Sequence, residues 1–215
     1  LNCAFDAGLK LESRHFASLA ADNVAHNMVR TLFFSMGDAN KLKSRPKDVE
    51  KSSFTKIGIL GAGMMGAGIA FVTASAGLEV VLLDSSQEAA DKGKSYSEDL
   101  LNKRISRKRM TEEKRDGILG LIKPTTDFAD LAGCEMVIEA VFEDRAIKAD
   151  VTAKTEAVIS EDAIFASNTS TLPITGLAEA SSRPASFIGL HFFSPVDKMP
   201  LVEIIMGEKT GDVAL

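Results

Sequence analysis

The chain has 215 residues, of which 45% are hydrophobic and 26% charged, and its formal net charge is -5. This composition is typical of a globular protein with enough apolar material for one good core, so we expect one full domain and an appendage. The acidic balance argues against nucleic acid as a partner. Because no run approaches the roughly 18 apolar residues of a membrane span, we expect no membrane span.

Two cysteines, Cys3 and Cys134, show neither metal-ligand nor CxxC spacing. We expect inert thiols in a reducing compartment, and no metal site is predicted. The chain begins with Leu rather than Met, which suggests a piece of a longer polypeptide.

Residues 1 to about 36 lack strand character, and their apolar residues recur three or four positions apart, which predicts one or two helices. The apolar stripe comprises Phe16, Leu19, Ala20, Val24, Met28 and Leu32. Asp22 is a candidate N-cap for the second helix. From Gly37 to Ser53, small, polar and basic residues predict a linker. We therefore divide the chain into a helical segment with linker, 1–53, and a domain, 54–215.

A glycine-rich turn follows the apolar run Lys56–Leu60 and precedes a helix-compatible run. It comprises Gly61, Ala62, Gly63, Met64, Met65 and Gly66. In dinucleotide-binding folds one such glycine makes the tight turn, one lets the backbone approach a pyrophosphate, and one lets the helix pack close to the strand. The anion rests on the free N–H groups of the helix. We predict that this turn binds a dinucleotide; the alternative is a glycine turn of an ordinary α/β protein.

Asp84 ends the next predicted strand, which follows Gly77, a candidate helix C-cap. An acidic residue at this position can bind the ribose 2′-hydroxyl. The next residues, Ser85, Ser86 and Gln87, offer no cation for a 2′-phosphate. The predicted cofactor is therefore NAD rather than NADP.

From Phe54 onward, short β-rich runs alternate with helical stretches, which predicts a Rossmann-type, doubly wound, mostly parallel α/β sheet. The predicted strands are Lys56 to Leu60, Glu79 to Leu83, Leu121 to Pro124, Met136 to Val141, Ala163 to Ser167, Phe187 to His191 and Leu201 to Met206. One long helical region, Gln87 to Gly120, carries a basic cluster formed by Lys103, Arg104, Arg107, Lys108 and Arg109. This cluster is either a solvated face or a site for the phosphates of a substrate such as coenzyme A.

Polar residues gather at the carboxyl ends of the later strands, where open α/β sheets bind ligands. They include Glu139, Glu143 and Lys148, the run Ser167 to Thr171, and the run His191 to Pro195. Glu203 stands alone in an apolar strand and should face a partner, because burying a lone carboxylate is costly. His191 is the natural candidate, since a histidine held by a carboxylate can accept the proton released in hydride transfer from an alcohol. The alternative is a structural histidine, with Glu203 at a solvent edge.

Four segments together resemble the NAD-binding domain of L-3-hydroxyacyl-CoA dehydrogenases. They are GAGMMGAGIA at 61–70, VIEAVFED at 137–144, FASNTSTLPI at 165–174 and GLHFFSPVDKMPLVEII at 189–205. The leading residues resemble the linker helix of the multifunctional, bifunctional or trifunctional fatty-acid oxidation α-subunits. The family's C-terminal helical domain, with much of its acyl site, would begin about where this chain stops, and the hydratase module is absent.

This resemblance implies NAD-dependent oxidation of (3S)-3-hydroxyacyl-CoA in fatty-acid β-oxidation. It implies that His191 is the general base and that Glu203 is its charge partner. Ser170 would donate a hydrogen bond to the substrate oxygen, with Asn168 in the adjoining loop. Glu143 and Lys148 would lie along the cofactor. Members often have Asn where Ser194 stands, which weakens any cofactor contact there.

The resemblance further implies a homo-oligomer or a complex with a thiolase subunit, in the bacterial cytoplasm or the mitochondrial matrix. Two other functions remain open from the sequence. One is another NAD-dependent hydroxy-acid or alcohol dehydrogenase, and the other is a nucleotide-binding module without turnover.

Overall fold

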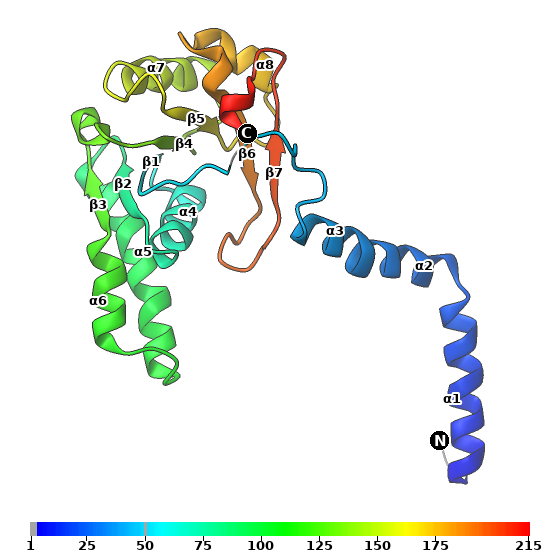
Figure 1. The fold of residues 1–215 in the computed structure, drawn as a ribbon. Coiled ribbons are helices and arrows are strands. Elements are labelled where there is room, and N and C mark those ends of the chain that lie inside the picture. Colours follow the sequence, from blue (N-terminus) through cyan, green and yellow to red (C-terminus); the bar gives the residue numbers. More distant parts are fainter. Residues whose placement is uncertain (1–3, 50) are drawn as a thin grey trace. The chain divides into compact units, whose positions relative to one another are not determined.

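The computed structural model describes residues 4–49 and 51–215, so Cys3 lies outside the described residues. The chain divides into two compact units, Leu1–Glu50 and Lys51–Leu215 (Figure 1). The first unit contains α1 (Phe5–Ala20), α2 (Asn23–Val29), the π-helical stretch η1 (Arg30–Ser35) and α3 (Met36–Asn40).

Asp22 caps α2 as predicted, because its carboxylate accepts the N–H of Val24 at 2.7 Å. The predicted linker starts too early, since α3 continues the helix through Asn40 and Lys41 N–H donates to the Gly37 carbonyl. The predicted apolar stripe is exposed within this unit.

The second unit is built on a seven-stranded sheet in the order β3-β2-β1-β4-β5-β6-β7. Strands β1 to β6 are parallel, and β7 runs antiparallel to β6. Their bounds are β1 Lys56–Leu60, β2 Glu79–Leu83, β3 Ile122–Thr125, β4 Met136–Glu139, β5 Ile164–Ser167, β6 Phe187–Phe192 and β7 Val202–Ile205. The strand order reverses between β1 and β4, as in a doubly wound fold. The predicted fold class is confirmed.

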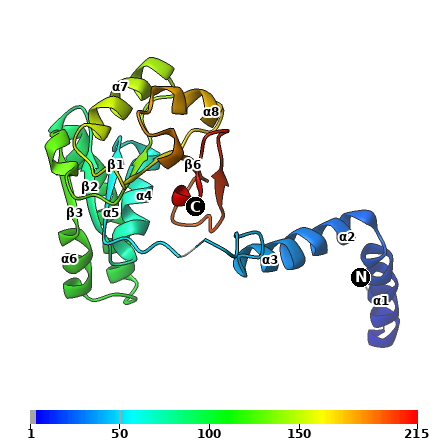
Figure 2. The ribbon, with the colours of Figure 1, turned by 45° about the horizontal axis from the view of Figure 1, so that its top comes forward.

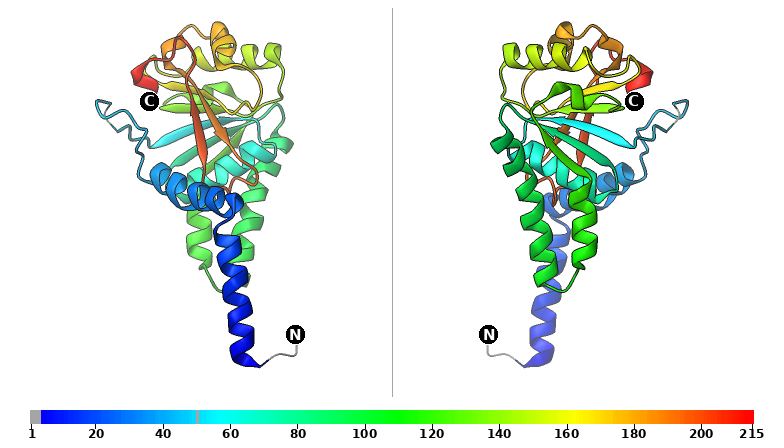
Figure 3. Two further views of the ribbon diagram at one scale, coloured as in Figure 1. Left: turned by 90° about the vertical axis from the view of Figure 1, so that its right-hand side faces the viewer. Right: turned by 90° about the vertical axis from the view of Figure 1, so that its left-hand side faces the viewer.

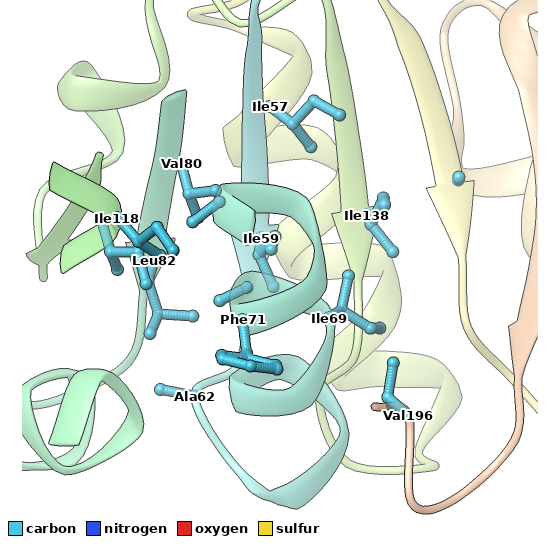
Figure 4. Close-up of a cluster of buried hydrophobic side chains, with 14 of the residues drawn as sticks. Ile57, Ile59, Ala62, Ile69, Phe71, Val80, Leu82, Ile118, Ile138 and Val196 are labelled. Carbon is cyan, nitrogen blue, oxygen red and sulfur yellow. The ribbon is translucent and has the colours of Figure 1, made fainter. Parts of the chain in front are cut away.

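Helices cover both faces of the sheet (Figures 2 and 3). Their bounds are α4 Met64–Ser75, α5 Gln87–Ser106, α6 Glu112–Gly120, α7 Arg145–Glu156 and α8 Ile174–Leu177. Short 3-10 turns lie at η2 Phe128–Leu131, η3 Ala178–Ala180, η4 Pro184–Ser186 and η5 Asp212–Ala214. Successive strand residues point to opposite faces, so one core lies under α4, α5 and α6 (Figure 4) and a second lies toward α7 and α8.

The predicted helical region Gln87–Gly120 is two helices rather than one. Lys108 adopts a left-handed backbone conformation (φ 56°), which a helix interior does not tolerate. Thr111 then restarts the helix by accepting the N–H of Lys114 at 3.3 Å. The C-cap of α4 is Ala76, and Gly77, the predicted cap, follows it with φ 93°.

Helix α4 also packs closely against the connection between β6 and β7. A Cβ at Gly68 would lie 2.9 Å from Cγ2 of Val196, and Val196 belongs to the same core as Ile69 and Phe71. Only glycine lets the two segments approach this far without a shift.

Cys134 is a free, buried thiol, as predicted. Burial raises its pKa to about 11, with Lys56 acting in the opposite direction, so the reactive thiolate is scarce at neutral pH. In residues 4–49 and 51–215 we find no helix with the length and apolar character that crossing a bilayer requires.

Candidate functional site

The glycine-rich turn joins β1 to α4 and has the features that a dinucleotide requires. Gly61 has φ 88°, and its missing Cβ would lie 2.7 Å from the Ala140 carbonyl oxygen. A Cβ at Gly66 would lie 1.7 Å from the Gly61 carbonyl oxygen, so only glycine fits there. At Gly63 a Cβ would meet no atom within 4 Å, which leaves open space beside the backbone. Gly63 is the N-cap of α4 and supplies no capping side chain, so the first helical turn suits an anion.

Asp84 follows β2 and lies against this turn. One carboxylate oxygen accepts the N–H of Ala62 at 2.6 Å, and the other accepts the N–H and the hydroxyl of Ser85 at 2.6 and 3.0 Å. A carboxylate offers about four acceptor positions. The partly exposed Asp84 therefore still has capacity for a ribose hydroxyl, and the residues present fit a dinucleotide.

His191 and Glu203 are directly opposite each other in the antiparallel β6–β7 pair. His191 Nδ1 lies 2.8 Å from Glu203 Oε2. The sequence analysis expected this pairing because it took the carboxylate of Glu203 to be buried. That reason is wrong, because the Glu203 side chain is 51% exposed. Cross-strand register, rather than the cost of burial, brings the two groups together.

A pocket of about 220 Å³ opens beside His191. It is lined by Met65, Asn168, Ser170, His191, Phe192, Phe193 and Ser194. Met65 lies in the first turn of α4, so the pocket adjoins the glycine-rich turn. The ring centroids of Phe193 and His191 lie 4.6 Å apart, a contact that the sequence analysis did not predict. Ser194 Oγ lies 3.9 Å from the sulfur of Met64, which links the end of β6 to the same turn.

Asn168 and Ser170 follow β5 and enter the pocket from a neighbouring loop. Asn168 Oδ1 accepts the N–H of Phe192 at 2.9 Å, so Asn168 holds the residue after His191. Ser170 is exposed, and its own N–H donates to Glu143 Oε1 at 3.2 Å. The structure therefore brings His191, Asn168 and Ser170 around one pocket.

One carboxylate oxygen of Glu143 accepts several hydrogen bonds from this loop. Oε1 accepts the Thr169 hydroxyl and, at 3.2 to 3.3 Å, the N–H groups of Ser170 and Thr171. Burial opposes ionisation of Glu143, but hydrogen bonds from Thr169 and Lys148, the charge of Lys148 and the Thr171 N–H lower its pKa to about 2. Glu143 is therefore an anion at any physiological pH.

Lys148 lies on α7 between two carboxylates. Its Nζ is 2.7 Å from Glu139 Oε1 and 3.1 Å from Glu143 Oε2. Asp144 is the N-cap of α7, and its carboxylate accepts the N–H groups of Ala146 and Ile147. The Lys148 side chain is only 3% exposed and the Glu139 side chain 1%, so this pair is buried.

Sequence reasoning missed the contacts of Ser167 and Thr169, although the strand-end rule places both at this edge of the sheet. The basic cluster lies at the end of α5 and in the turn before α6, and Arg104 stacks 5.0 Å over the Phe71 ring. Its other members are exposed. The described residues contain no group of three or more histidine, cysteine or acidic side chains that could hold a metal ion.

Comparison with known sequences finds one matching family, described as "3-hydroxyacyl-CoA dehydrogenase, NAD binding domain", over residues 56–215. The chain is 42% identical over 205 residues to the fatty acid oxidation complex subunit alpha of Shewanella halifaxensis, covering 95% of the chain and 29% of that protein. It is 39% identical over 214 residues to the same subunit of Pseudomonas putida strain F1, covering 100% and 30%. The chain thus spans about 30% of the length of these relatives.

Solved structures of dehydrogenases also align with the chain. (S)-3-hydroxybutyryl-CoA dehydrogenase from Ralstonia eutropha aligns with a TM-score of 0.73 and 41% identity, over 75% of this chain and 57% of that one. The dehydrogenase part of multifunctional enzyme 1 from C. elegans aligns with a TM-score of 0.69 and 30% identity, over 78% and 38%.

Proposed function

This chain belongs to the family of the 3-hydroxyacyl-CoA dehydrogenase NAD-binding domain, and on that premise we propose that it binds the cofactor and accepts the proton in an enzyme that oxidises (3S)-3-hydroxyacyl-CoA to 3-ketoacyl-CoA. NAD is the cofactor of this family's domain, as the sequence predicted. The observation that carries the proposal is the His191–Glu203 pair beside a pocket that adjoins the glycine-rich turn.

The chain's residues divide the work of holding NAD. The turn of Gly61, Gly63 and Gly66, with Met64 and Met65, accommodates the pyrophosphate at the start of α4. Asp84 accepts a hydrogen bond from the adenosine ribose. Glu143 would lie along the cofactor, and the buried Lys148 would act there through Glu143, which it holds at 3.1 Å. When bound, the nicotinamide accepts the hydride from the substrate carbon.

His191 is the general base. An ionised carboxylate only accepts hydrogen bonds, so Nδ1 of His191 carries the proton that it shares with Glu203. The other ring nitrogen, Nε2, is then unprotonated and can take the hydroxyl proton of the substrate as the hydride leaves. Glu203 stabilises the positive charge that develops on the imidazole.

Ser170 and Asn168 act on the substrate side of the pocket. Ser170 is exposed in the pocket and donates a hydrogen bond to the reacting oxygen. Asn168 keeps Phe192, and with it His191, in position through its 2.9 Å hydrogen bond.

We also propose an assembly and a compartment for the protein. The relatives are named subunits of a complex, which supports assembly as a homo-oligomer or with a thiolase subunit. They are bacterial, and we place the protein in the bacterial cytoplasm, with the mitochondrial matrix as the corresponding compartment in eukaryotes.

The test is a turnover assay on the 215-residue chain and on the natural-length protein, with a 3-hydroxyacyl-CoA and NAD⁺, following NADH absorbance. The chain should bind NAD but turn over little, because it covers only about 30% of the length of its relatives. The natural-length protein should turn over acyl-CoA. If the natural-length protein oxidised free 3-hydroxy acids at the same rate, it would instead be a hydroxy-acid dehydrogenase. If the natural-length protein bound NAD but turned over no substrate, the non-catalytic module would be favoured.

A further inference from the structure

Glu139 and Lys148 form a buried ion pair, and the proposed reaction gives Glu139 no role. The two side chains are 1% and 3% exposed, and Lys148 Nζ lies 2.7 Å from Glu139 Oε1. Two charges are therefore buried between β4 and α7. Burying such charges costs desolvation, which good geometry and additional hydrogen bonds must offset. Glu139 has these bonds, because Oε1 also accepts the Val141 N–H at 2.8 Å and Oε2 accepts the Ser167 hydroxyl at 2.7 Å.

The network extends from this pair to the pocket by two routes. In the first, Lys148 also binds Glu143 at 3.1 Å, and Glu143 holds the N–H groups of Ser170 and Thr171. In the second, Glu139 holds Ser167, the residue before Asn168. Asn168 in turn binds the Phe192 N–H next to His191.

Glu139 itself does not line the pocket. We propose that Glu139 is a positioning residue, which holds Lys148 and Ser167 so that Ser170 and Asn168 stay in place beside His191. The effect of Glu139 on turnover rests on the proposed function, whereas its effect on the loop that carries Asn168 and Ser170 does not.

The negative charge of Glu139 is the property that matters. A glutamine of the same shape can still accept from Lys148 and Val141 and can donate to the Ser167 hydroxyl. What it removes is the counter-charge, which leaves Lys148 paired with the more exposed Glu143. Lys148 should then move toward Glu143, and the donors of the Ser170 loop that converge on Glu143 should lose their fixed positions.

The first experiment measures amide hydrogen exchange in the 215-residue chain by NMR. In Glu139→Gln, the exchange of the Ser170 and Thr171 amides should accelerate at least about tenfold more than that of the Ile59 amide in β1, which reports the change in global stability. Unchanged rates at Ser170 and Thr171 would overturn the proposal. If this variant unfolds, Ser167→Ala, which removes one hydroxyl, should show the same pattern with a smaller increase.

Glu156→Gln is the matched control. Glu156 also lies on α7 and also anchors a loop, because its carboxylate accepts from the Ser181 hydroxyl and the Ser182 N–H. This variant should accelerate exchange at Ser182 but not at Ser170 or Thr171. Acceleration at Ser170 in both variants would assign the effect to general loosening of α7 and would overturn the proposal.

The second experiment measures turnover in the natural-length protein. Small displacements of reacting groups reduce rates strongly, so kcat per folded molecule should fall about tenfold in Glu139→Gln and less than twofold in Glu156→Gln. A normal kcat in Glu139→Gln would refute the positioning role. If the unmodified protein itself shows no turnover, the proposed function fails, and the exchange measurement alone decides the role of Glu139.

Discussion

Replacing Lys148 by methionine should destabilise the second unit strongly, because it leaves the buried carboxylate of Glu139 without its cation. Removing one partner of a buried pair costs about 3 to 5 kcal/mol. An unfolding entropy of about 2.1 cal/mol/K per residue, over the about 165 residues of Lys51–Leu215, converts this loss to a melting temperature lower by about 9 to 14 °C.

The assay is thermal unfolding of the 215-residue chain followed by circular dichroism, and Lys154→Met is the control. Lys154 lies on the same helix and pairs with Asp150 at 2.6 Å, but their side chains are 55% and 57% exposed. Such a surface pair contributes at most about 1 kcal/mol, so the control should melt within about 3 °C of the unmodified chain. If Lys148→Met melts no lower than Lys154→Met, the reasoning about the buried pair is refuted.

Three other predictions concern the cofactor, the dyad and pH. The chain should bind NAD at least about tenfold more tightly than NADP, a difference of about 1.4 kcal/mol, because Asp84 would repel a 2′-phosphate; equal affinities in calorimetric titration would remove Asp84 from the ribose site. In the natural-length protein, His191→Ala should lower turnover about 10² to 10⁴-fold with little change in NAD affinity, and Glu203→Gln should act in the same direction; near-normal turnover in either variant would return His191 to a structural role. The pKa of Glu143 is lowered from 4.5 to about 2, so its ionised form stabilises the fold above about pH 4.5 and this contribution is lost as pH falls toward 2. Urea unfolding at several pH values should therefore show the stability difference between the unmodified chain and Glu143→Gln shrinking over that range, and a constant difference would contradict it.

The strands were predictable because their apolar runs stand out against polar connections, and those of β1, β2, β4 and β5 are buried on both faces, whereas β7 is apolar but exposed. All seven predicted strands are present, with ends within about two residues of those predicted. The break in the helical region at Lys108 was not predictable, because no glycine or proline marks the left-handed residue there.

The site was predictable where chain order alone decides proximity. Strand ends meet at one edge of a parallel sheet, so His191, Asn168 and the glycine-rich turn were expected together. The environment of Lys148 was not predictable, because its burial depends on how α7 is rotated against β4. The sequence analysis placed Lys148 at this edge of the sheet, but nothing in the sequence indicates that its side chain is buried between Glu139 and Glu143. The position of Phe193 against His191 likewise depends on side-chain packing beyond the strand end.

The contact between Gly68 and Val196 joins two parts of the site that are far apart in the sequence. Gly68 lies on the helix that follows the nucleotide-binding turn, and Val196 lies on the connection between the strands of His191 and Glu203. The glycine-rich turn and the β6–β7 pair therefore share one packed core. A side chain larger than glycine at position 68 would clash with Val196 and push this connection away from α4, so a substitution only two residues beyond Gly66 would also disturb the strand pair that holds His191 and Glu203.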